Sequence, residues 1–581
     1  MRDGFLATLD LLSERLPHTP IFVLSGLATG SDQLAVHWAT DWAQGRPRLA
    51  GRPRLRCVGV LPLDRDDYLR DFEPGNQRDE FELTERLCAF VFALPDPDGP
   101  GVGDQDARDR RYRDLGLFIA RQSDVLVAFW DGKPVLKTGG TADVINLCTA
   151  GGLRPIDHVL WEHQDCPFQR GRPLLIDEER VPVVHAPALR LGDGSTPAVL
   201  GPGAESEGVV RAGDDWVLPE SFVERERVNR HLVESAFVPE QPGSFARSCL
   251  DGDERWDFLQ ARRRHLSGAA SAFKHGLARE DRLTIGLFVL GILLFQVFSS
   301  LFDDVALEPR PLDDLIRIAL VLGYLGFLGW GVVRSRAARR RRVDFVQATL
   351  RAVGEGMRIQ AAMLRAHGRD VQVGNWMSAR TCRGTEPLRS MLRACVLEAI
   401  ALDRDRRVRE ILRGAGDQGT AEATSDWVDD QIRYFGNQLS ETSRRSRRVA
   451  RFRRVKRMAG GFVFCVAVAM LVFVGGHFVT RHGLAEVLPG AEMWVSIGTL
   501  LIGVSLAIFA GIEMAESSEQ TSIELEEFRR MRDIFGIARR RIELAPGKAS
   551  EVVQGLGKEA IAEVAEWYVR NRERAVETKL G

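Results

Sequence analysis

Cysteine and histidine are too sparse in this chain to indicate a metal site or a disulfide framework. The eight cysteines are scattered over 581 residues without a C-x-x-C pair. The eleven histidines form neither an H-E-x-x-H motif nor a cluster with cysteine, which are the patterns typical of zinc sites. We therefore expect reduced thiols, no metal and no resident cofactor.

The chain also lacks an excess of charge of either sign. Its 79 basic and 80 acidic residues give a formal net charge of -1, so no global charge attracts it to nucleic acid, and no nucleic-acid partner is expected. The segment from Met1 to Leu16 has the pattern of an amphipathic helix rather than that of a signal peptide. A chain of this length is expected to form several domains.

Long apolar runs are present in the second half of the chain. A helix needs about 20 residues to cross the hydrocarbon core of a bilayer. Four runs approach that length and come in two closely spaced pairs, at residues 284–302, 315–333, 460–479 and 494–512. The pattern predicts two transmembrane hairpins.

Basic residues flank these runs unevenly. Arginine-rich stretches extend from Arg334 to Arg342 and from Arg444 to Arg457, whereas the connection inside each pair carries little positive charge. Because positive residues stay on the cytoplasmic side, we expect a multi-pass protein of the inner (plasma) membrane with both termini cytoplasmic. The basic stretches could also be nucleic-acid patches. Their position beside apolar runs favours anionic lipid headgroups, near Arg339 to Arg342 and Arg444 to Arg457.

The first third of the chain alternates apolar strands with helical segments. The strand PIFVL is followed by a glycine-containing turn and a helix, and further strands are predicted in RLRCVGVLPL, LCAFVFALP, SDVLVAFW and RVPVVHAPALR. Apolar strands without polar alternation are typical of a parallel sheet covered on both faces. The fold class predicted is an α/β Rossmann-like parallel-sheet N-terminal domain with an all-α C-terminal half, containing four transmembrane helices and amphipathic cytoplasmic helices.

The same patterns predict the domain organisation. The expected parts are a ligand-binding α/β domain (1–235, with a flexible Gly/Pro/Ser-rich excursion at 191–230), a helical linker (236–282), a first transmembrane hairpin (283–333), a cytoplasmic helical region (334–457), a second transmembrane hairpin (458–513) and C-terminal cytoplasmic helices (514–581).

Two glycine-containing turns lie at the predicted carboxyl ends of strands, where ligands bind in such sheets. We call them the first glycine turn (residues 25–30) and the second glycine turn (residues 138–141). Missing Cβ atoms allow close approach to the backbone, and a following helix N-terminus favours an anion. The predicted ligand-binding residues are Ser25, Gly26, Thr29, Gly30, Asp32, Tyr112, Asp131, Gly132, Thr138, Gly139, Gly140 and Thr141.

At these residues the chain resembles a known superfamily. The turn SGLATGSD, the segment from YRDLG to SDVLVAFWDG, and GGTADVI resemble the SLOG superfamily of Rossmann-like domains. That superfamily includes DNA-processing proteins, cytokinin-activating phosphoribohydrolases and the cytoplasmic heads of TRPM channels. The resemblance covers roughly residues 21–190 and implies that the two glycine turns hold a nucleotide-derived ligand.

The second half resembles the SLATT family of membrane effectors, in which a membrane hairpin continues into cytoplasmic helices. The segment EVAEWYVRNRERAVE is similar to the closing helix of that family, although this chain has two predicted hairpins rather than one. SLOG heads joined to such segments occur in bacterial conflict systems. The resemblance therefore implies a homo-oligomeric membrane effector of anti-phage defence, which senses a nucleotide signal and opens or disrupts the membrane.

Catalysis is not expected, and no catalytic residue is predicted. The phosphoribohydrolase branch carries a P-G-G-x-G-T-x-x-E loop with a catalytic glutamate, and Val144 occupies the corresponding position here, while Asp143 lies one residue short of it. Two alternatives stay open at this point. One is a membrane-anchored nucleotide-processing enzyme that uses Asp32, Asp131 or Asp143, and the other is a constitutive channel, transporter or scaffold.

Overall fold

The computed structural model describes more than half of the chain, in separate segments. The described residues are 1–46, 54–94, 105–131, 140–149, 182–188, 209–211, 216–234, 254–302, 311–367, 384–400, 427–444 and 521–577, with the single positions 373, 377, 447, 454 and 458. The chain divides into two compact units. The first unit comprises Met1–Ala270, Ala348–Ser425 and Arg541–Asn571, and the second comprises Ser271–Gln347, Asp426–Arg540 and Arg572–Gly581.

The strands of the first unit form two parallel sheets. One has the order β1 (Ile21–Ser25), β2 (Leu55–Leu61) and β3 (Phe90–Ala93), and the other has the order β4 (Leu126–Trp130), β5 (Val183–Pro187) and β6 (Val209–Arg211). Every strand pairing is parallel. β1 and β4 are each the edge of their sheet. The parallel direction agrees with the apolar strand pattern, but the expected single sheet is divided into two.

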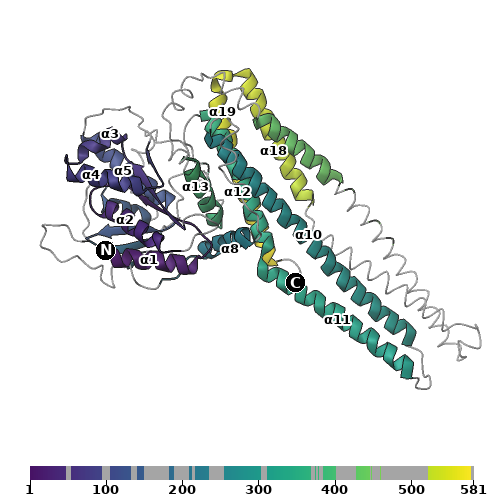
Figure 1. Cartoon of the computed structure of the whole chain (residues 1–581). Coiled ribbons are helices and arrows are strands. Elements are labelled where there is room, and N and C mark those ends of the chain that lie inside the picture. The colour runs from purple at the N-terminus through teal and green to yellow at the C-terminus, as the bar shows by residue number, and fades with distance from the viewer. Residues whose placement is uncertain are drawn as a thin grey trace, which may run out of the picture. The chain divides into compact units, whose positions relative to one another are not determined.

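Helices follow the strands along the chain, as Figure 1 shows. They are α1 (Arg2–Arg15), α2 (Ser31–Gln44), α3 (Arg65–Tyr68), the short 3-10 helix η1 (Leu69–Asp71), α4 (Asn76–Leu87), α5 (Gln105–Gln122) and α6 (Thr141–Thr149). The helices α1, α2 and α4 share one apolar core with β2, in which Phe5, Val36, Leu61 and Phe81 lie. Burying side chains of this size stabilises the fold by about 1.5–3 kcal/mol each.

Four more helices contribute to the first unit. They are α8 (Glu220–Glu234), α13 (Glu386–Ile400), the first part of α10 (Glu254–Phe302) and most of α12 (Val343–His367). α19 (Ala549–Glu577) joins them as far as Asn571, where the hydroxyl of Thr349 donates to Tyr568 at 3.4 Å. Strand β6 and the start of α8 fall within the predicted flexible excursion at 191–230. α8 buries the apolar side chains of Phe222 and Val228 in this unit.

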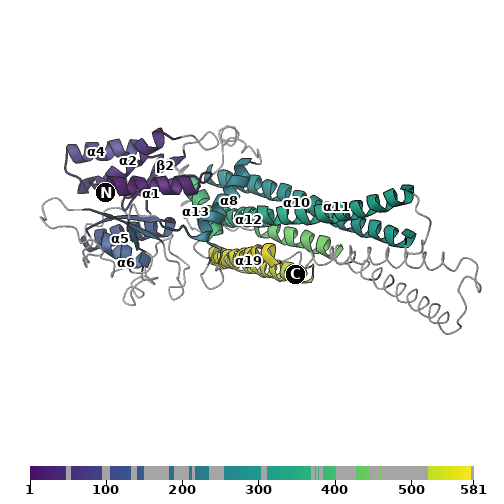
Figure 2. The ribbon, with the colours of Figure 1, turned by 90° about the horizontal axis from the view of Figure 1, so that it is seen from below.

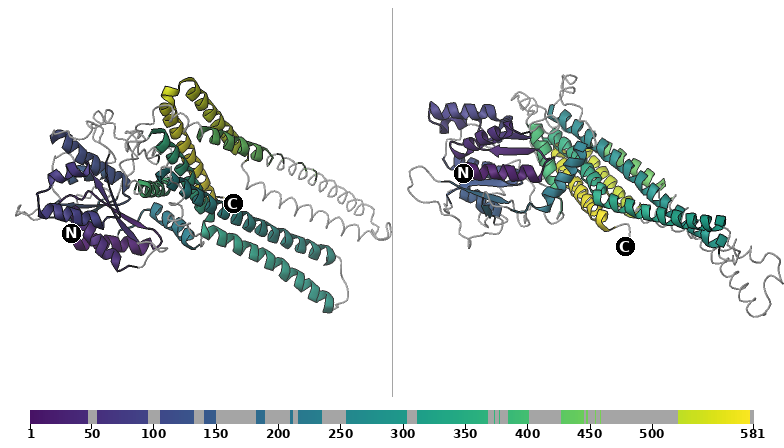
Figure 3. Two further views of the ribbon diagram at one scale, coloured as in Figure 1. Left: turned by 45° about the horizontal axis from the view of Figure 1, so that its top comes forward. Right: turned by 60° about the horizontal axis from the view of Figure 1, so that its bottom comes forward.

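The second unit contains an antiparallel helix pair formed by the rest of α10 and by α11 (Pro311–Arg341). The two helices lie side by side in Figures 2 and 3. A Cβ atom at Gly331 would lie 3.2 Å from the ring of Phe288, and the ring centroids of Phe295 and Tyr324 are 5.1 Å apart. Arg334 forms an ion pair with Glu280.

A second helix pair in this unit packs through aromatic rings. α18 (Thr521–Leu544) lies beside the helical residues 427–444, and the 3-10 helix η4 (Pro546–Lys548) follows it in the chain. The ring centroids of Trp427 and Phe535 are 5.3 Å apart, and those of Phe435 and Phe535 are 5.7 Å apart. The predicted amphipathic helices at these positions therefore bury their apolar stripes on each other.

The predicted transmembrane helices are contradicted by this structure. Within the part of the chain that is described, no helix is both long and apolar enough to cross a membrane. The first two predicted spans coincide with the end of α10 and the middle of α11. Phe288 and Leu294 of α10 lie against Gly331 and Gly323 of α11, whereas other large apolar side chains of the two segments, such as Leu322 and Trp330, are exposed. The spans predicted at 460–479 and 494–512 lie outside the described residues.

Two predictions are corrected by this finding. The fold class is wrong because the described residues are mostly helical, with two small parallel sheets and no helix suited to crossing a membrane. The predicted location, a multi-pass protein of the plasma membrane with cytoplasmic termini, is contradicted on the same ground.

Candidate functional site

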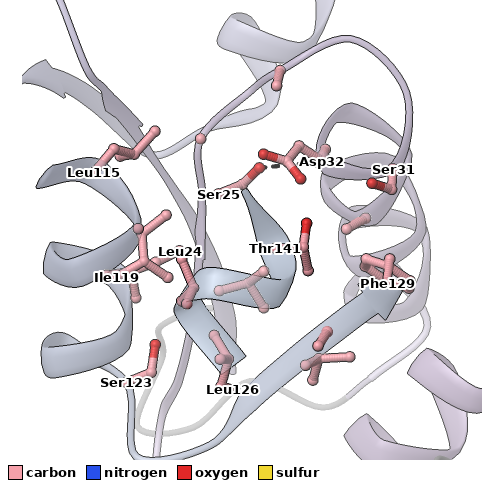
Figure 4. A pocket seen from close by; sticks show the side chains of 18 of the residues that line it. Leu24, Ser25, Ser31, Asp32, Leu115, Ile119, Ser123, Leu126, Phe129 and Thr141 are labelled. Atoms are coloured by element: carbon pink, nitrogen blue, oxygen red, sulfur yellow. Dashed lines mark hydrogen bonds between the residues drawn. The ribbon is translucent and has the colours of Figure 1, made fainter. Parts of the chain in front are cut away.

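A cavity of about 720 Å³ lies in the first unit, between the edge strands β1 and β4. Its walls come from both strands, from α1 and α5, and from the first turns of α2 and α6. Figure 4 shows Ser25, Ser31, Asp32 and Thr141 together at one end of this space, and apolar side chains such as Leu24 and Ile119 at the other. A volume of this size is typical of a small-molecule site.

The first glycine turn is held by hydrogen bonds from both sides. The hydroxyl of Ser25 accepts from the backbone N–H of Leu27 at 3.2 Å and donates to the carbonyl of Asp32 at 3.0 Å. The buried hydroxyl of Tyr68 donates to the carbonyl of Gly26 at 3.0 Å, and Gln33 donates to the carbonyl of Leu27 at 3.2 Å. These contacts fix the turn in one conformation at the wall of the cavity.

Glycine is required at two positions of this turn for different reasons. A Cβ atom at Gly26 would lie 3.0 Å from both Asp32 Oδ2 and Leu115 Cδ2. Gly30 precedes the first residue of α2 with φ of 103°, in the region that only glycine adopts readily. Leu27 also has a positive φ, 56°, and its side chain is fully buried. The glycines in the sequence predicted a turn here, and the positive φ values show that the backbone turns sharply.

Asp32 is the carboxylate that the turn places in the cavity. It lies at the first turn of α2 and accepts hydrogen bonds from the backbone N–H groups of Ala28 and Gly26. Burial raises the pKa of Asp32 to about 6, and the two backbone hydrogen bonds only partly offset this. A carboxyl group with a pKa near neutrality in a cleft can hold or release a proton under physiological conditions.

The second glycine turn contributes only its last two residues to the described cavity. Gly140 and Thr141 line the cavity where α6 begins, and the carbonyl of Gly140 accepts from the backbone N–H groups of Asp143 and Val144. The predicted site residues Gly132, Thr138 and Gly139 lie outside the described residues. Asp131, directly after β4, is described but does not line the cavity.

The remaining predicted residues can be placed as follows. Ser25, Gly26, Thr29, Asp32 and Tyr112 line the same cavity as Gly140 and Thr141. Gly30 shapes the turn without lining the cavity. The structure therefore brings residues of two distant sequence segments, and one residue of α5, to a single site.

Tyr112 has partners that the sequence did not reveal. Its hydroxyl donates to Asp71 Oδ2 at 2.5 Å, and Arg108 Nη2 donates to Asp71 Oδ1 at 2.6 Å. Burial, and then the hydrogen bond to Asp71, raise the pKa of Tyr112. Asp71, Arg108 and Asp109 also line the cavity. Arg108 lies one helical turn before Tyr112, so its position on the same face of α5 could have been predicted.

The charges at this cavity are predominantly negative. Among the described lining residues, the charged side chains are Asp32, Asp71, Asp109 and Arg108. The guanidinium of Arg108 is already engaged by Asp71. An anionic group would therefore rely on backbone N–H groups, such as those at the start of α6, rather than on side-chain cations.

Val144 and Asp143 lie close to the cavity with different roles. Val144 lines it and packs on Gly116 of α5. Asp143 forms an ion pair with Arg113 at 3.4 Å and does not line the cavity. Of the three carboxylates considered for an enzyme, Asp32 is thus the one that lines the described cavity. No group of three or more potential metal ligands is found among the described residues.

Comparison with known proteins adds no relative. No family model, no curated protein and no solved structure matches the chain.

Proposed function

We propose that the α/β part of the chain is a sensor that binds a nucleotide with a single phosphate in the cavity between β1 and β4. The observation that carries this proposal is the convergence of the two glycine turns on one cavity of about 720 Å³. The resemblance of the same turns to those of SLOG domains supports it.

The phosphate would lie at the start of α6. The first backbone N–H groups of a helix have no partner within the helix, and the helix dipole favours an anion there. Gly140 leaves space for close approach to this backbone, and the Thr141 hydroxyl lies beside it in the cavity wall. Each charge-assisted hydrogen bond contributes about 1.5–3 kcal/mol to binding.

The carboxylates of the cavity determine which groups the ligand can carry besides its first phosphate. Asp32 lies near Ser25 and Thr141 and is suited to accept hydrogen bonds from ribose hydroxyl groups. Asp71 and Asp109 add further negative charge. These carboxylates would repel a second or third phosphate, so a nucleoside monophosphate is the favoured ligand.

The sensor would act without turning over its ligand. The position of the catalytic glutamate in related hydrolases is Val144, which packs on Gly116, and the neighbouring Asp143 is paired with Arg113. A ligand that binds one conformation more tightly shifts the population toward it. Moving the ratio of two conformations from 1:99 to 99:1 requires that the ligand bind one of them more tightly by about 5.5 kcal/mol. Two or three phosphate contacts would supply this difference.

A nucleotide-processing enzyme is the second candidate. The specific observation in its favour is Asp32, whose pKa of about 6 suits a general acid or base. In that case AMP would be converted during incubation, and Asp32→Asn would abolish the conversion.

Calorimetry with the full chain and AMP, ADP and ATP tests the proposal. We expect affinity to decrease from AMP to ATP, and Gly140→Glu to abolish AMP binding by placing a carboxylate at the phosphate position. Gly45→Glu is the matched control, because it adds the same group at an open position after α2. Chromatography of the recovered AMP then separates the candidates: intact nucleotide supports the sensor, and released products support the enzyme. Absence of binding by all three nucleotides would contradict both.

A further inference from the structure

A second cavity, of about 380 Å³, lies at the opposite ends of the same strands. It is lined by the first residues of β1, by the turn that leads into β4, and by α8, α10, α12 and α13, all within the first unit. None of the predicted site residues lines it. Ile21, Phe22 and Leu24 of β1 line both cavities.

Most of the wall of this second cavity is apolar. Its side chains come from helices distant in the sequence and include Leu16, Phe222, Leu266, Val353 and Leu397. All five are buried in the first unit. Burial also raises the pKa of the Cys395 thiol, in the same wall, to about 12, although the charge of Arg262 acts to lower it. An occupant must therefore have an apolar body.

One carboxylate and two guanidinium groups form an ion cluster in this wall. Glu398 of α13 accepts from Arg56 of β2 at 2.6 Å and from Arg262 of α10 at 2.7 Å. All three side chains are mostly buried, with 14% of Glu398 and 22% of Arg262 exposed. Burial tends to raise the pKa of Glu398, but the charges and hydrogen bonds of Arg262 and Arg56 outweigh it and lower the pKa. The carboxyl group is therefore ionised, and the cluster carries one positive charge in excess.

A second ion pair in the wall is balanced. Arg225 of α8 contacts Asp124 and Ser390, and the Ser390 hydroxyl donates to Asp124 at 2.8 Å. The Arg225–Asp124 pair is itself neutral, so it does not offset the excess charge of the first cluster. Among the described residues, Arg262 Nε is buried and has no hydrogen-bond partner. A buried charge without an opposite charge is costly, and an anionic ligand would remove that cost.

We propose that the second cavity binds a monoanionic amphiphile, a carboxylate with an apolar chain, whose head group lies beside Arg262 and Arg56. The apolar wall would hold the chain, and the excess positive charge would select an acid over the corresponding alcohol. This site adjoins the nucleotide cavity along β1, and the proposal does not depend on the function proposed for that cavity.

Octanoate and 1-octanol are suitable probes, because they share one apolar chain and differ in head-group charge. Calorimetry on the full chain should show octanoate binding at least about tenfold more tightly than 1-octanol, as expected for one charge-assisted hydrogen bond. Equal affinities, or binding of neither probe, would contradict the proposal.

Two variants of the same cluster provide the decisive comparison. Arg262→Gln removes the excess charge and should weaken octanoate binding about tenfold, whereas Glu398→Gln increases the excess charge and should strengthen it. Neither should change the affinity for 1-octanol by a comparable factor. Weakening of octanoate binding by both variants would indicate a purely structural role and overturn the assignment.

Two further variants show which of the two cavities the probes occupy. Ala394→Phe fills the cavity from α13, one helical turn before Glu398, and it should abolish binding of both probes. Gly140→Glu alters the other cavity and should leave octanoate binding unchanged. If Ala394→Phe has no effect while Gly140→Glu abolishes octanoate binding, the ligand occupies the nucleotide cavity and the proposal is wrong.

Discussion

Gly116 of α5 and Val144 of α6 are in such close contact that a Cβ atom at Gly116 would lie 2.4 Å from Val144 Cγ2. The two helices therefore approach at a distance that only glycine permits at this point. Because α6 begins at Thr141, this contact also determines where the helix N-terminus meets the cavity. The packing of α5 on α6 thus also sets the position of the proposed phosphate site.

The first prediction concerns this contact. Gly116→Ala should reduce the free energy of unfolding by about 1–3 kcal/mol, because overpacking forces neighbouring atoms to move. Adding Val144→Ala in the same chain should recover part of the loss, since it removes the methyl groups in conflict. Urea unfolding of the two single variants and the double variant measures the coupling. Additive effects would show that the two side chains do not share this space.

The second prediction concerns the pH dependence contributed by Asp32. Its pKa is raised from 3.8 to about 6 in the folded protein, so the folded state binds this proton more tightly than the unfolded state. The resulting stabilisation is fully present below pH 4 and is lost as the pH rises through 6. Asp32→Asn should therefore be more stable than the wild-type chain above pH 6, by up to about 3 kcal/mol.

Chemical unfolding of both proteins between pH 4 and 8 tests this. Their difference in stability should grow from pH 4 to about pH 6 and level off above it. A constant difference between wild type and Asp32→Asn at every pH would contradict the raised pKa.

The third prediction separates the effect of backbone conformation from the effect of the space available for a Cβ atom. Gly30 and Gly45 flank α2, and a Cβ atom would meet no other atom within 4 Å at either position. Only Gly30 has a positive φ, 103°, whereas the φ of Gly45 is -84°. Gly30→Ala should cost about 1–2 kcal/mol through backbone strain, and Gly45→Ala should be neutral or stabilising by up to about 1 kcal/mol.

Thermal unfolding of the two variants measures the contrast. Equal effects would mean that the turn at Gly30 relaxes without cost. In that case the first glycine turn would not depend on a fixed conformation.

Local sequence patterns predicted much of the first unit. The apolar strand at Ile21, the turn after Ser25 and the helix start at Ser31 all follow from residue periodicity and glycine placement. The start of α6 at Thr141 was predicted in the same way. These features depend on neighbouring residues alone, so a single sequence is sufficient to predict them.

Contacts between distant segments could not be predicted. Asp71 meets Tyr112 across 41 residues, and Glu398 meets Arg56 across 342 residues. Nothing in the local pattern of either residue identifies its partner. The apolar runs in α10 and α11 were misassigned for a related reason. Hydropathy reports that a helix is apolar, but it does not report whether another helix packs against it.

The separation of β1 from β4 has a consequence for mutational study of the cavity. Each strand is the edge of its own sheet, and the cavity lies between them. Edge strands present a row of main-chain donors and acceptors on their open side. A ligand there can form hydrogen bonds with the polypeptide chain itself, which no side-chain substitution removes. Scanning this wall with alanine would therefore record only part of the recognition, and exchange of amide hydrogens along β1 and β4 would report the rest.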